Sequence, residues 1–427
     1  KNSIYLSNRA LIHLKMENFG LALADANKSI EIDKSYIKAY YRRASALLFL
    51  RKYDEALGDL NYLNSQVPNN EDIINKINNT KAERRKQRFL ESIQSDQADK
   101  PRVDLFGQQF KTYQVEKSYN QQVYESENKI DEGNSKEKKE EDLTSPTFNK
   151  NFNRLSLASP SFGSKIDENW VVRLMEDMKN SKFIHKKYLT QMIFDAKAIF
   201  DSEKSLVDIE VDNNVEISVC GDTHGQYYDL LNIFKINGYP SKTNPYLFNG
   251  DFVDRGSFSV EVVVALIAWK LLYPNHFFLS RGNHESKNLN KMYGFEGEVK
   301  NKYDDKIYEL FSMLFCSLPL CHVINKKVFV VHGGLFSKDG VTLDDIRKID
   351  RIREPSDSGL MCECLWSDPC KEQGRLPSKR GVGLSFGPDV TRKFLALNDL
   401  EMVVRSHEVK QEGYEVDHDG KLVTVFS

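Results

Sequence analysis

The second half of the chain alternates short apolar runs with stretches whose apolar residues recur at helical spacing. The runs are rich in Val, Ile and Phe, as buried strands are, and cover residues 215–220, 246–249, 276–280, 328–331 and 402–406. Helices are predicted before and between them, over residues 167–178, 188–200, 227–236 and 259–272. This alternation predicts an α/β (α+β) core of strand–helix–strand units. The later strands have shorter connections and predict a second, mixed sheet facing the first, so we expect a β-sandwich flanked by helices.

The first 90 residues repeat themselves at a spacing of 34 residues. The matching positions are Asn8 with Arg42, Ala10 with Ala44, Leu14 with Leu48, Phe19 with Tyr53, Ala22 with Ala56 and Asp25 with Asp59. A helix–turn–helix period of this length resembles the tetratricopeptide repeat and predicts an all-α domain over residues 1–94, closed by a helix over residues 70–92. Two copies are visible and such arrays usually need about three, so we expect that a first repeat is missing upstream.

Residues 95–165 follow neither pattern. They combine low hydrophobicity with many charges, a composition that cannot repay the loss of chain entropy, and we expect a disordered polar linker. Two Ser-Pro steps, at Ser145 and Ser159, are candidate kinase targets, with ordinary linker composition as the alternative. A further domain is expected over residues 166–427.

Composition narrows the class of protein. The chain has 427 residues and a formal charge of −2, which gives no footprint for nucleic acid, and no apolar stretch approaches the ~20 residues of a membrane span. Its six cysteines form no Cys-x-x-Cys pair, which favours a reducing compartment. The chain begins without Met and stops inside an apparent strand, so we expect both ends, including the C-terminus of the last domain, to be truncated.

Each of the five apolar runs ends at side chains that bind metals. If the carboxyl ends of these strands share a rim, the candidate ligands meet there, and they are Asp222, His224, Asp251, Asn283, His332 and His407. Carboxylate, amide and imidazole ligands without thiolate suit Mn²⁺, Fe or Zn. Asp222 and His224 can bind one ion, and Asp251 can bridge to a second. Two such ions favour the hydrolysis of a phosphoester.

Residues next to these ligands predict the other catalytic roles. His284 follows a ligand directly, so its side chain should face the substrate and can act as general acid, with Asp254 fixing its tautomer. Arg255 and Arg380 are candidates for holding the phosphate group, and Asn283 is counted with them.

A single Asp-x-His motif is a weak signal, and one His at a strand end is more often a core residue than a ligand. All five segments in one order favour the metal site instead. Two other functions stay open at this point. One is a metal-dependent phosphodiesterase or nucleotide hydrolase, and the other is a non-catalytic adaptor whose repeats bind partners.

The motifs at residues 221–225, 250–256 and 281–285 read Gly-Asp-x-His-Gly, Gly-Asp-x-Val-Asp-Arg-Gly and Arg-Gly-Asn-His-Glu. In this order, and followed by the segments at residues 365–369 and 405–409, they resemble the phosphoprotein phosphatase family of serine/threonine phosphatases, and the repeats resemble those of its repeat-bearing members. The resemblance covers residues 1–92 and 167–427. It implies a metallophosphoesterase-type sandwich that hydrolyses phosphoserine and phosphothreonine with two divalent metal ions, Mn²⁺ or Fe/Zn.

The resemblance also implies how such an enzyme is controlled. The repeat domain inhibits the active site and captures the C-terminal peptide of the ninety-kilodalton heat-shock chaperone. The matching clamp positions are Asn8, Lys38 and Arg42; Lys38 and Arg42 are four residues apart and share one helix face. The expected partners are phosphoprotein substrates and this chaperone, with no nucleic acid and no membrane span. The expected location is the cytoplasm, with the nucleus as a second site.

Overall fold

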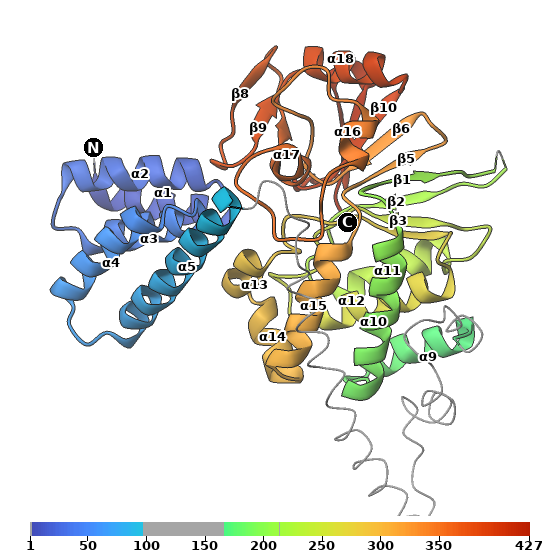
Figure 1. The fold of residues 1–427 in the computed structure, drawn as a ribbon, viewed down its shortest axis with the longest axis horizontal. Coiled ribbons are helices and arrows are strands. Elements are labelled where there is room, and N and C mark those ends of the chain that lie inside the picture. Colours follow the sequence, from blue (N-terminus) through green and yellow to red (C-terminus); the bar gives the residue numbers. More distant parts are fainter. Residues whose placement is uncertain (1, 97–165, 213) are drawn as a thin grey trace, which may run out of the picture.

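The computed structural model describes residues 2–96, 166–212 and 214–427, with side chains described up to residue 85 in the first range. Almost all of the predicted linker, with both Ser-Pro steps, lies outside these residues. Figure 1 shows two bodies, a bundle of N-terminal helices beside a larger domain of sheets and helices. Within the described residues, no helix is long and apolar enough to span a bilayer.

The N-terminal body is built of antiparallel helices stacked in sequence order. They are α1 (Ser3–Lys15), α2 (Phe19–Ile32), α3 (Ile37–Phe49), α4 (Tyr53–Gln66) and α5 (Glu71–Asp96). The repeat extends to the ion pairs: Arg9 lies 2.5 Å from Asp25 across α1 and α2, and Arg43 lies 2.6 Å from Asp59 across α3 and α4. Both pairs join positions that the spacing of 34 residues relates, so the predicted helical repeat fold is confirmed.

The larger domain carries three sheets. The first is parallel and contains β2 (Ser218–Cys220), β3 (Tyr246–Phe248) and β4 (Phe277–Leu279). The second is mixed, in the order β1 (Leu206–Ile209), β5 (Cys321–Ile324), β6 (Val328–Val331), β10 (Met402–Arg405), β12 (Leu422–Val425) and β11 (Tyr414–Asp417). A small third sheet holds β7 (Asp368–Pro369), β9 (Leu384–Phe386) and β8 (Arg375–Pro377).

The two large sheets pack face to face. A small apolar core fills the space between them, and its buried members are Ile209, Leu247, Phe278, Ile324, Val330 and Val404. Because these residues come from both sheets, the predicted sandwich with a mixed second sheet is confirmed.

Helices cover the outer faces of the sandwich. Those on the side of the parallel sheet are α9 (Glu168–Lys179), α10 (Lys186–Ser202), α11 (Tyr227–Asn237), α12 (Ser259–Leu272), α14 (Phe295–Lys302) and α15 (Asp305–Ser317), which share the largest core with that sheet. Those on the other side are α16 (Leu343–Arg347), α17 (Leu360–Trp366) and α18 (Pro388–Asn398). The short α13 (Lys287–Tyr293) leads into α14, and a 3₁₀ turn covers His418–Gly420. All six cysteines lie in the larger domain and none forms a disulfide.

Candidate active site

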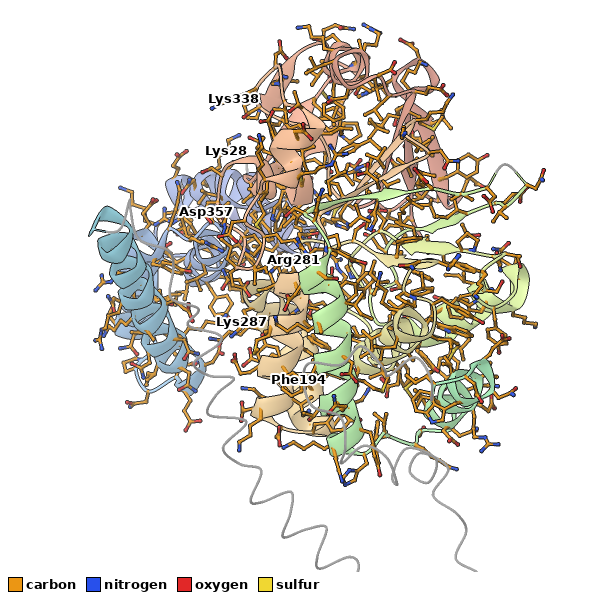
Figure 2. All side chains as sticks on the ribbon, turned by 45° about the vertical axis from the view of Figure 1, so that its right-hand side comes forward. Lys28, Phe194, Arg281, Lys287, Lys338 and Asp357 are labelled. Atoms are coloured by element: carbon orange, nitrogen blue, oxygen red, sulfur yellow. The ribbon has the colours of Figure 1, made fainter. Side chains whose placement is uncertain are left out.

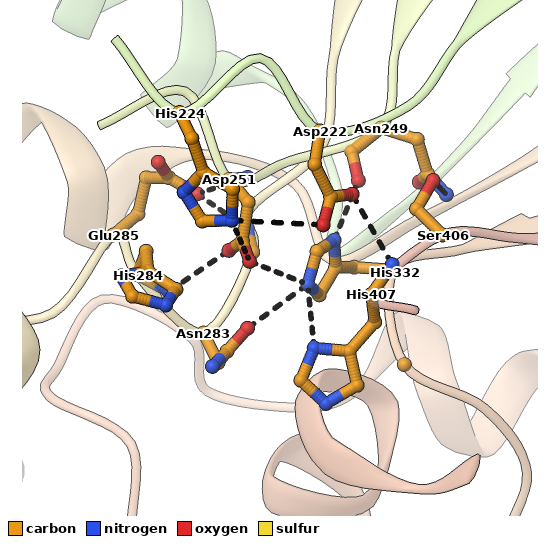
Figure 3. A network of polar contacts seen from close by, with 12 residues as sticks. Asp222, His224, Asn249, Asp251, Asn283, His284, Glu285, His332, Ser406 and His407 are labelled. Carbon is orange, nitrogen blue, oxygen red and sulfur yellow. Dashed lines mark hydrogen bonds and ion pairs between the residues drawn. The ribbon is translucent and has the colours of Figure 1, made fainter. Parts of the chain in front are cut away.

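The predicted ligands converge where the two sheets meet (Figure 3). β2, β3 and β4 run parallel, so the residues after each strand emerge at one edge, and β6 and β10 run parallel to each other in the facing sheet. Several of these residues leave their strands with a left-handed backbone: φ is 40° at His224, 53° at Asp251 and 71° at His407. Such strain is uncommon outside glycine and concentrates at functional sites.

Side-chain atoms that could bind a metal form two overlapping groups, the first of which includes the candidate acid His284. His224, Asp251 and His284 offer atoms within 4.8 Å of one another, and so do Asp251, His332 and His407. Asp251 belongs to both groups, which is the arrangement expected of a residue that bridges two ions. Asp222 completes the first group, with Oδ2 lying 3.8 Å from Nε2 of His224.

The chemistry of these atoms fits a pair of cations. Nε2 of His332 lies 2.9 Å from Oδ1 of Asn283 and 3.2 Å from Nδ1 of His407. When His332 is neutral and its proton is on the Nδ1 atom that faces the carbonyl of Asn249, all three of these atoms are acceptors. Acceptors that crowd together in a buried site cannot hydrogen-bond to one another, but a metal ion can bind the lone pairs of all of them.

The electrostatics of the bare ligands support the same fit. Burial and the neighbouring Asp251 raise the pKa of Asp222 to about 7. Burial and the charge of His284 lower the pKa of His224 to about 4, so that it is neutral and able to bind a metal. Burial alone would lower the pKa of His332, but the adjacent Asp251 raises it to about 9. Bound cations would replace these protons as the source of positive charge.

Backbone contacts orient the ligands. Nδ1 of His332 lies 2.7 Å from the carbonyl of Asn249, and Nδ1 of His224 lies 3.0 Å from the carbonyl of Val253, so the Nε2 atom of each ring is left for a metal. The carboxylate of Glu285 accepts hydrogen bonds of 2.8 Å from three backbone N–H groups, those of residues 251, 252 and 282. Sequence reasoning assigned no role to Glu285, whose position after His284 was the only signal.

The structure places His284 and Asp254 together as expected. Nδ1 of His284 lies 2.8 Å from Oδ2 of Asp254, and both side chains are fully buried. Asp254 is held in turn by the side chain of Asn290 at 3.1 Å and by the backbone N–H of Phe295 at 3.0 Å. Nε2 of His284 therefore points away from Asp254 and is left for another partner.

The two candidate phosphate-binding arginines are each held by a neighbouring side chain. Arg255 stacks on the ring of Tyr293, 5.2 Å from its centroid. Arg380 is buried, with Nε 2.6 Å from Asp368, and it also donates to the carbonyl of His407. Asp368 holds Arg380 in place and was not among the predicted site residues.

A carboxylate of the repeat domain fills the space between these groups. Glu17, in the turn between α1 and α2, is 2% exposed, and its Oε1 lies 2.6 Å from Nε2 of His284 and pairs with Arg255. Its Oε2 lies 3.7 Å from Arg380 and 3.5 Å from the side-chain nitrogen of Asn283. Burial would raise the pKa of Glu17, but His284 and the two arginines hold that pKa well below its ordinary value. No sequence pattern predicted Glu17 in this site.

Other contacts hold the repeat domain in this position. The backbone N–H of Gly20 donates to the carbonyl of Arg380 at 3.1 Å, and Phe19 packs against Trp366. Arg51, at the turn position 34 residues after Glu17, donates to the carbonyl of Pro355 and lies 2.9 Å from Asp357. Figure 2 labels Asp357 on the side of the larger domain that faces the repeats. Both turn residues have a left-handed backbone, with φ of 58° and 53°.

The predicted clamp residues lie on α1 and α3. Nη1 of Arg42 contacts Oδ1 of Asn8 at 3.1 Å and the hydroxyl of Ser7 at 2.6 Å. Lys38 lies one turn before Arg42 on α3. Burial lowers the pKa of Arg42 from its ordinary value.

Comparison with known proteins gives this architecture a family. The family described as Calcineurin-like phosphoesterase matches residues 215–411, and the PPP5 TPR repeat region matches residues 77–208. The chain is 46% identical to serine/threonine-protein phosphatase 5 of Homo sapiens over 100% of its length and 78% of the relative. It is 44% identical to serine/threonine-protein phosphatase T of Trypanosoma brucei brucei, over 100% of this chain and 82% of that one.

A solved protein serine/threonine phosphatase from Saccharomyces cerevisiae is also similar, with a TM-score of 0.60 and 46% identity over 61% of this chain and 83% of that chain. The catalytic fold, the helical repeats and two overlapping groups of candidate metal-binding residues thus occur in one chain whose similarity to these relatives spans both domains. The chain therefore belongs to the serine/threonine-protein phosphatase 5 family and is a serine/threonine protein phosphatase.

Proposed function

We propose that this phosphatase hydrolyses phosphoserine and phosphothreonine at a dinuclear metal site, is inhibited by its own repeat domain, and is recruited and released by an acidic chaperone peptide. Asp222, His224 and Asp251 would hold one ion, and Asp251, Asn283, His332 and His407 the other. The ions would be Mn²⁺ or Fe/Zn, and when bound they would supply a hydroxide nucleophile and neutralise charge on the phosphoryl oxygens.

The chain's own side chains carry the proton and the phosphate group. His284 donates a proton from Nε2 to the departing serine or threonine oxygen, while Asp254 holds its Nδ1–H and stabilises the imidazolium before transfer. Arg255 and Arg380, with the amide of Asn283, hold the phosphate oxygens between them. These groups give a transferring phosphoryl group its position and its compensating charge.

The buried carboxylate of Glu17 is the observation that carries the regulatory part of the proposal. It contacts His284, Arg255, Arg380 and Asn283, which are the four groups assigned to the substrate. A carboxylate with two anionic oxygens satisfies the same donors as a phosphate. Glu17 therefore takes the place of the substrate phosphate, and the enzyme is active when the repeat domain moves away.

The peptide clamp is connected to this inhibitory residue through α1. Asn8 lies in the middle of α1, which ends at Lys15, two residues before Glu17. An acidic peptide that binds Asn8, Lys38 and Arg42 would contact α1, the helix that leads into the inhibitory residue Glu17. Release by the ninety-kilodalton heat-shock chaperone follows if the bound peptide favours the undocked repeat domain.

Titration with an acidic peptide that ends in a free carboxylate tests this function. We expect the rate of phosphopeptide hydrolysis by the full chain, with Mn²⁺ added, to rise with peptide concentration, and Arg42→Ala to abolish the rise. Lys28→Ala, which removes an exposed cation from α2, is the matched control and should respond like the unmodified chain. A rate that does not change with peptide concentration, or a rise in Arg42→Ala as large as in the unmodified chain, would contradict recruitment through the clamp.

A further inference from the structure

Tyr293 contacts the phosphate-binding group, the proposed general acid and the repeat domain. The guanidinium of Arg255 lies over its ring, the ring of His284 lies 5.2 Å away, and the backbone carbonyl of Tyr293 accepts a hydrogen bond of 3.1 Å from the N–H of Arg255. Its hydroxyl donates to the carbonyl of Leu14 at 3.1 Å. The mechanism above gives this hydroxyl no role.

Leu14 and Glu17 belong to the same turn at the end of α1. Within three residues, this turn gives a backbone carbonyl to Tyr293 and a carboxylate to His284. The Leu14 carbonyl lies in the last turn of its helix, where carbonyls have lost their helical partners, and it accepts from the N–H of Glu17 as well. The turn thus offers the active site the two acceptors that a phosphorylated peptide has, an anionic group and a nearby main-chain carbonyl.

We propose that the Tyr293 hydroxyl binds a main-chain carbonyl of the phosphoprotein substrate, in the position that the Leu14 carbonyl takes when the repeat domain is docked. This inference rests on the proposed function, in which Glu17 stands where the substrate phosphate binds. Every peptide has main-chain carbonyls, so the contact favours phosphoproteins over small phosphate esters without demanding a particular sequence.

The surroundings of Tyr293 suit a hydrogen-bond donor. Burial and the charge of Glu17 raise the pKa of its hydroxyl well above the ordinary value, so it keeps its proton. Stacking on Arg255 and the edge of His284 fix the ring, so the hydroxyl is aimed without loss of side-chain freedom on binding. The ring and the hydroxyl can be tested separately, because Phe keeps the ring.

The test compares two substrates in the full chain. We measure kcat/KM for a phosphopeptide and for p-nitrophenyl phosphate, which has no peptide carbonyl, with Mn²⁺ present and in the Glu17→Ala background. Tyr293→Phe should lower the ratio of the two values by about fivefold, the effect of one lost hydrogen bond. Tyr293→Leu, which also removes the stack on Arg255, should raise KM for both substrates.

Tyr303→Phe is the matched control. The Tyr303 hydroxyl also donates to a carbonyl, that of Ile184 at 2.9 Å, but it contacts none of the proposed active-site residues, so its loss should leave the ratio unchanged. An unchanged ratio in Tyr293→Phe, or an equal fall in Tyr303→Phe, would overturn the inference. Failure of the inhibitory role of Glu17 is a separate result, because it is read from the activity of Glu17→Ala alone and leaves the substrate ratio measurable.

Discussion

Replacement of Glu17 by Ala is predicted to activate the phosphatase. The carboxylate is buried among His284, Arg255 and Arg380, and it lies 2.6 Å from Nε2 of the proposed acid. Ala removes both acceptor oxygens and leaves the three cationic groups free for a phosphate. Activity should therefore rise even without a chaperone peptide.

The size of the effect follows from the contacts that are lost. Hydrogen bonds between charged groups contribute about 1.5–3 kcal/mol each. Glu17 makes two such bonds, to His284 and Arg255, and the cost of burying the charges offsets part of their contribution. A net loss of about 2–3 kcal/mol corresponds to a shift of about 30- to 150-fold toward the undocked state. The contact of Phe19 with Trp366 remains, so the variant should keep some residual docking.

The assay is phosphopeptide hydrolysis at saturating Mn²⁺, with inorganic phosphate as a second probe. In Glu17→Ala we expect a higher kcat/KM and tighter inhibition by phosphate, because the phosphate no longer competes with a built-in carboxylate. Glu31→Ala removes an exposed carboxylate of α2 and should behave like the unmodified chain. Unchanged activity together with unchanged phosphate inhibition in Glu17→Ala would refute this reasoning.

Three further predictions follow from other parts of the structure. In the Glu17→Ala background, His284→Asn should lower kcat on a phosphopeptide by about 10² to 10⁴ while leaving metal content intact, which kinetics and elemental analysis would check; an equal kcat would remove its role as acid. Burial raises the pKa of Asp195 to about 6, so this carboxyl favours the folded state at low pH and that stability is lost as pH rises from about 4 to about 6. Asp195→Asn should therefore raise the free energy of unfolding above pH 6 by roughly 1 kcal/mol and have little effect on it at pH 4. Urea unfolding at both pH values is the measurement, and a variant that is less stable than the unmodified chain above pH 6 would contradict the prediction. A methyl group on Gly256 would lie 2.2 Å from a backbone oxygen, so Gly256→Ala should lower the free energy of unfolding by about 1–3 kcal/mol in a thermal unfolding experiment. Gly58 lies within α4 and a methyl group there would meet no atom within 4 Å, so Gly58→Ala should raise the free energy of unfolding by up to about 1 kcal/mol.

Local sequence patterns predicted the elements whose burial is uniform along their length. The strand at residues 328–331 and the helix at residues 259–272 match β6 and α12, because nearly every side chain in them is buried. The strand expected from Val215 begins only at Ser218. Val215 closes a turn with Asp212, and strand pairing starts where the N–H of Ser218 reaches the carbonyl of Pro245.

The chemistry of the candidate active site was predictable from the sequence, but only some of the residues around the candidate metal ligands were. The six candidate metal ligands stand out in the sequence because they are polar residues at the ends of apolar runs, and the structure brings them together (Figure 3). The division of the chain at residues 94 and 165 stays a prediction, because most of the linker lies outside the described residues.

Glu17 could not be found from the sequence. In the repeat it stands in an ordinary helix–turn–helix connection, where a charged residue is expected to face water. Its role depends on how two domains pack, and the periodicity of one domain carries no information on that packing. The same holds for Arg51 and Tyr293, whose partners lie more than two hundred residues away in the chain.

Elemental analysis tests the central claim most directly, since all of the proposed chemistry depends on the ligand groups that share Asp251. After loading with Mn²⁺ and dialysis, the full chain should retain about two ions, and Asp251→Asn should retain fewer because its carboxylate belongs to both groups. A chain that keeps no Mn²⁺, or an Asp251→Asn variant that keeps as much as the unmodified protein, would contradict the account.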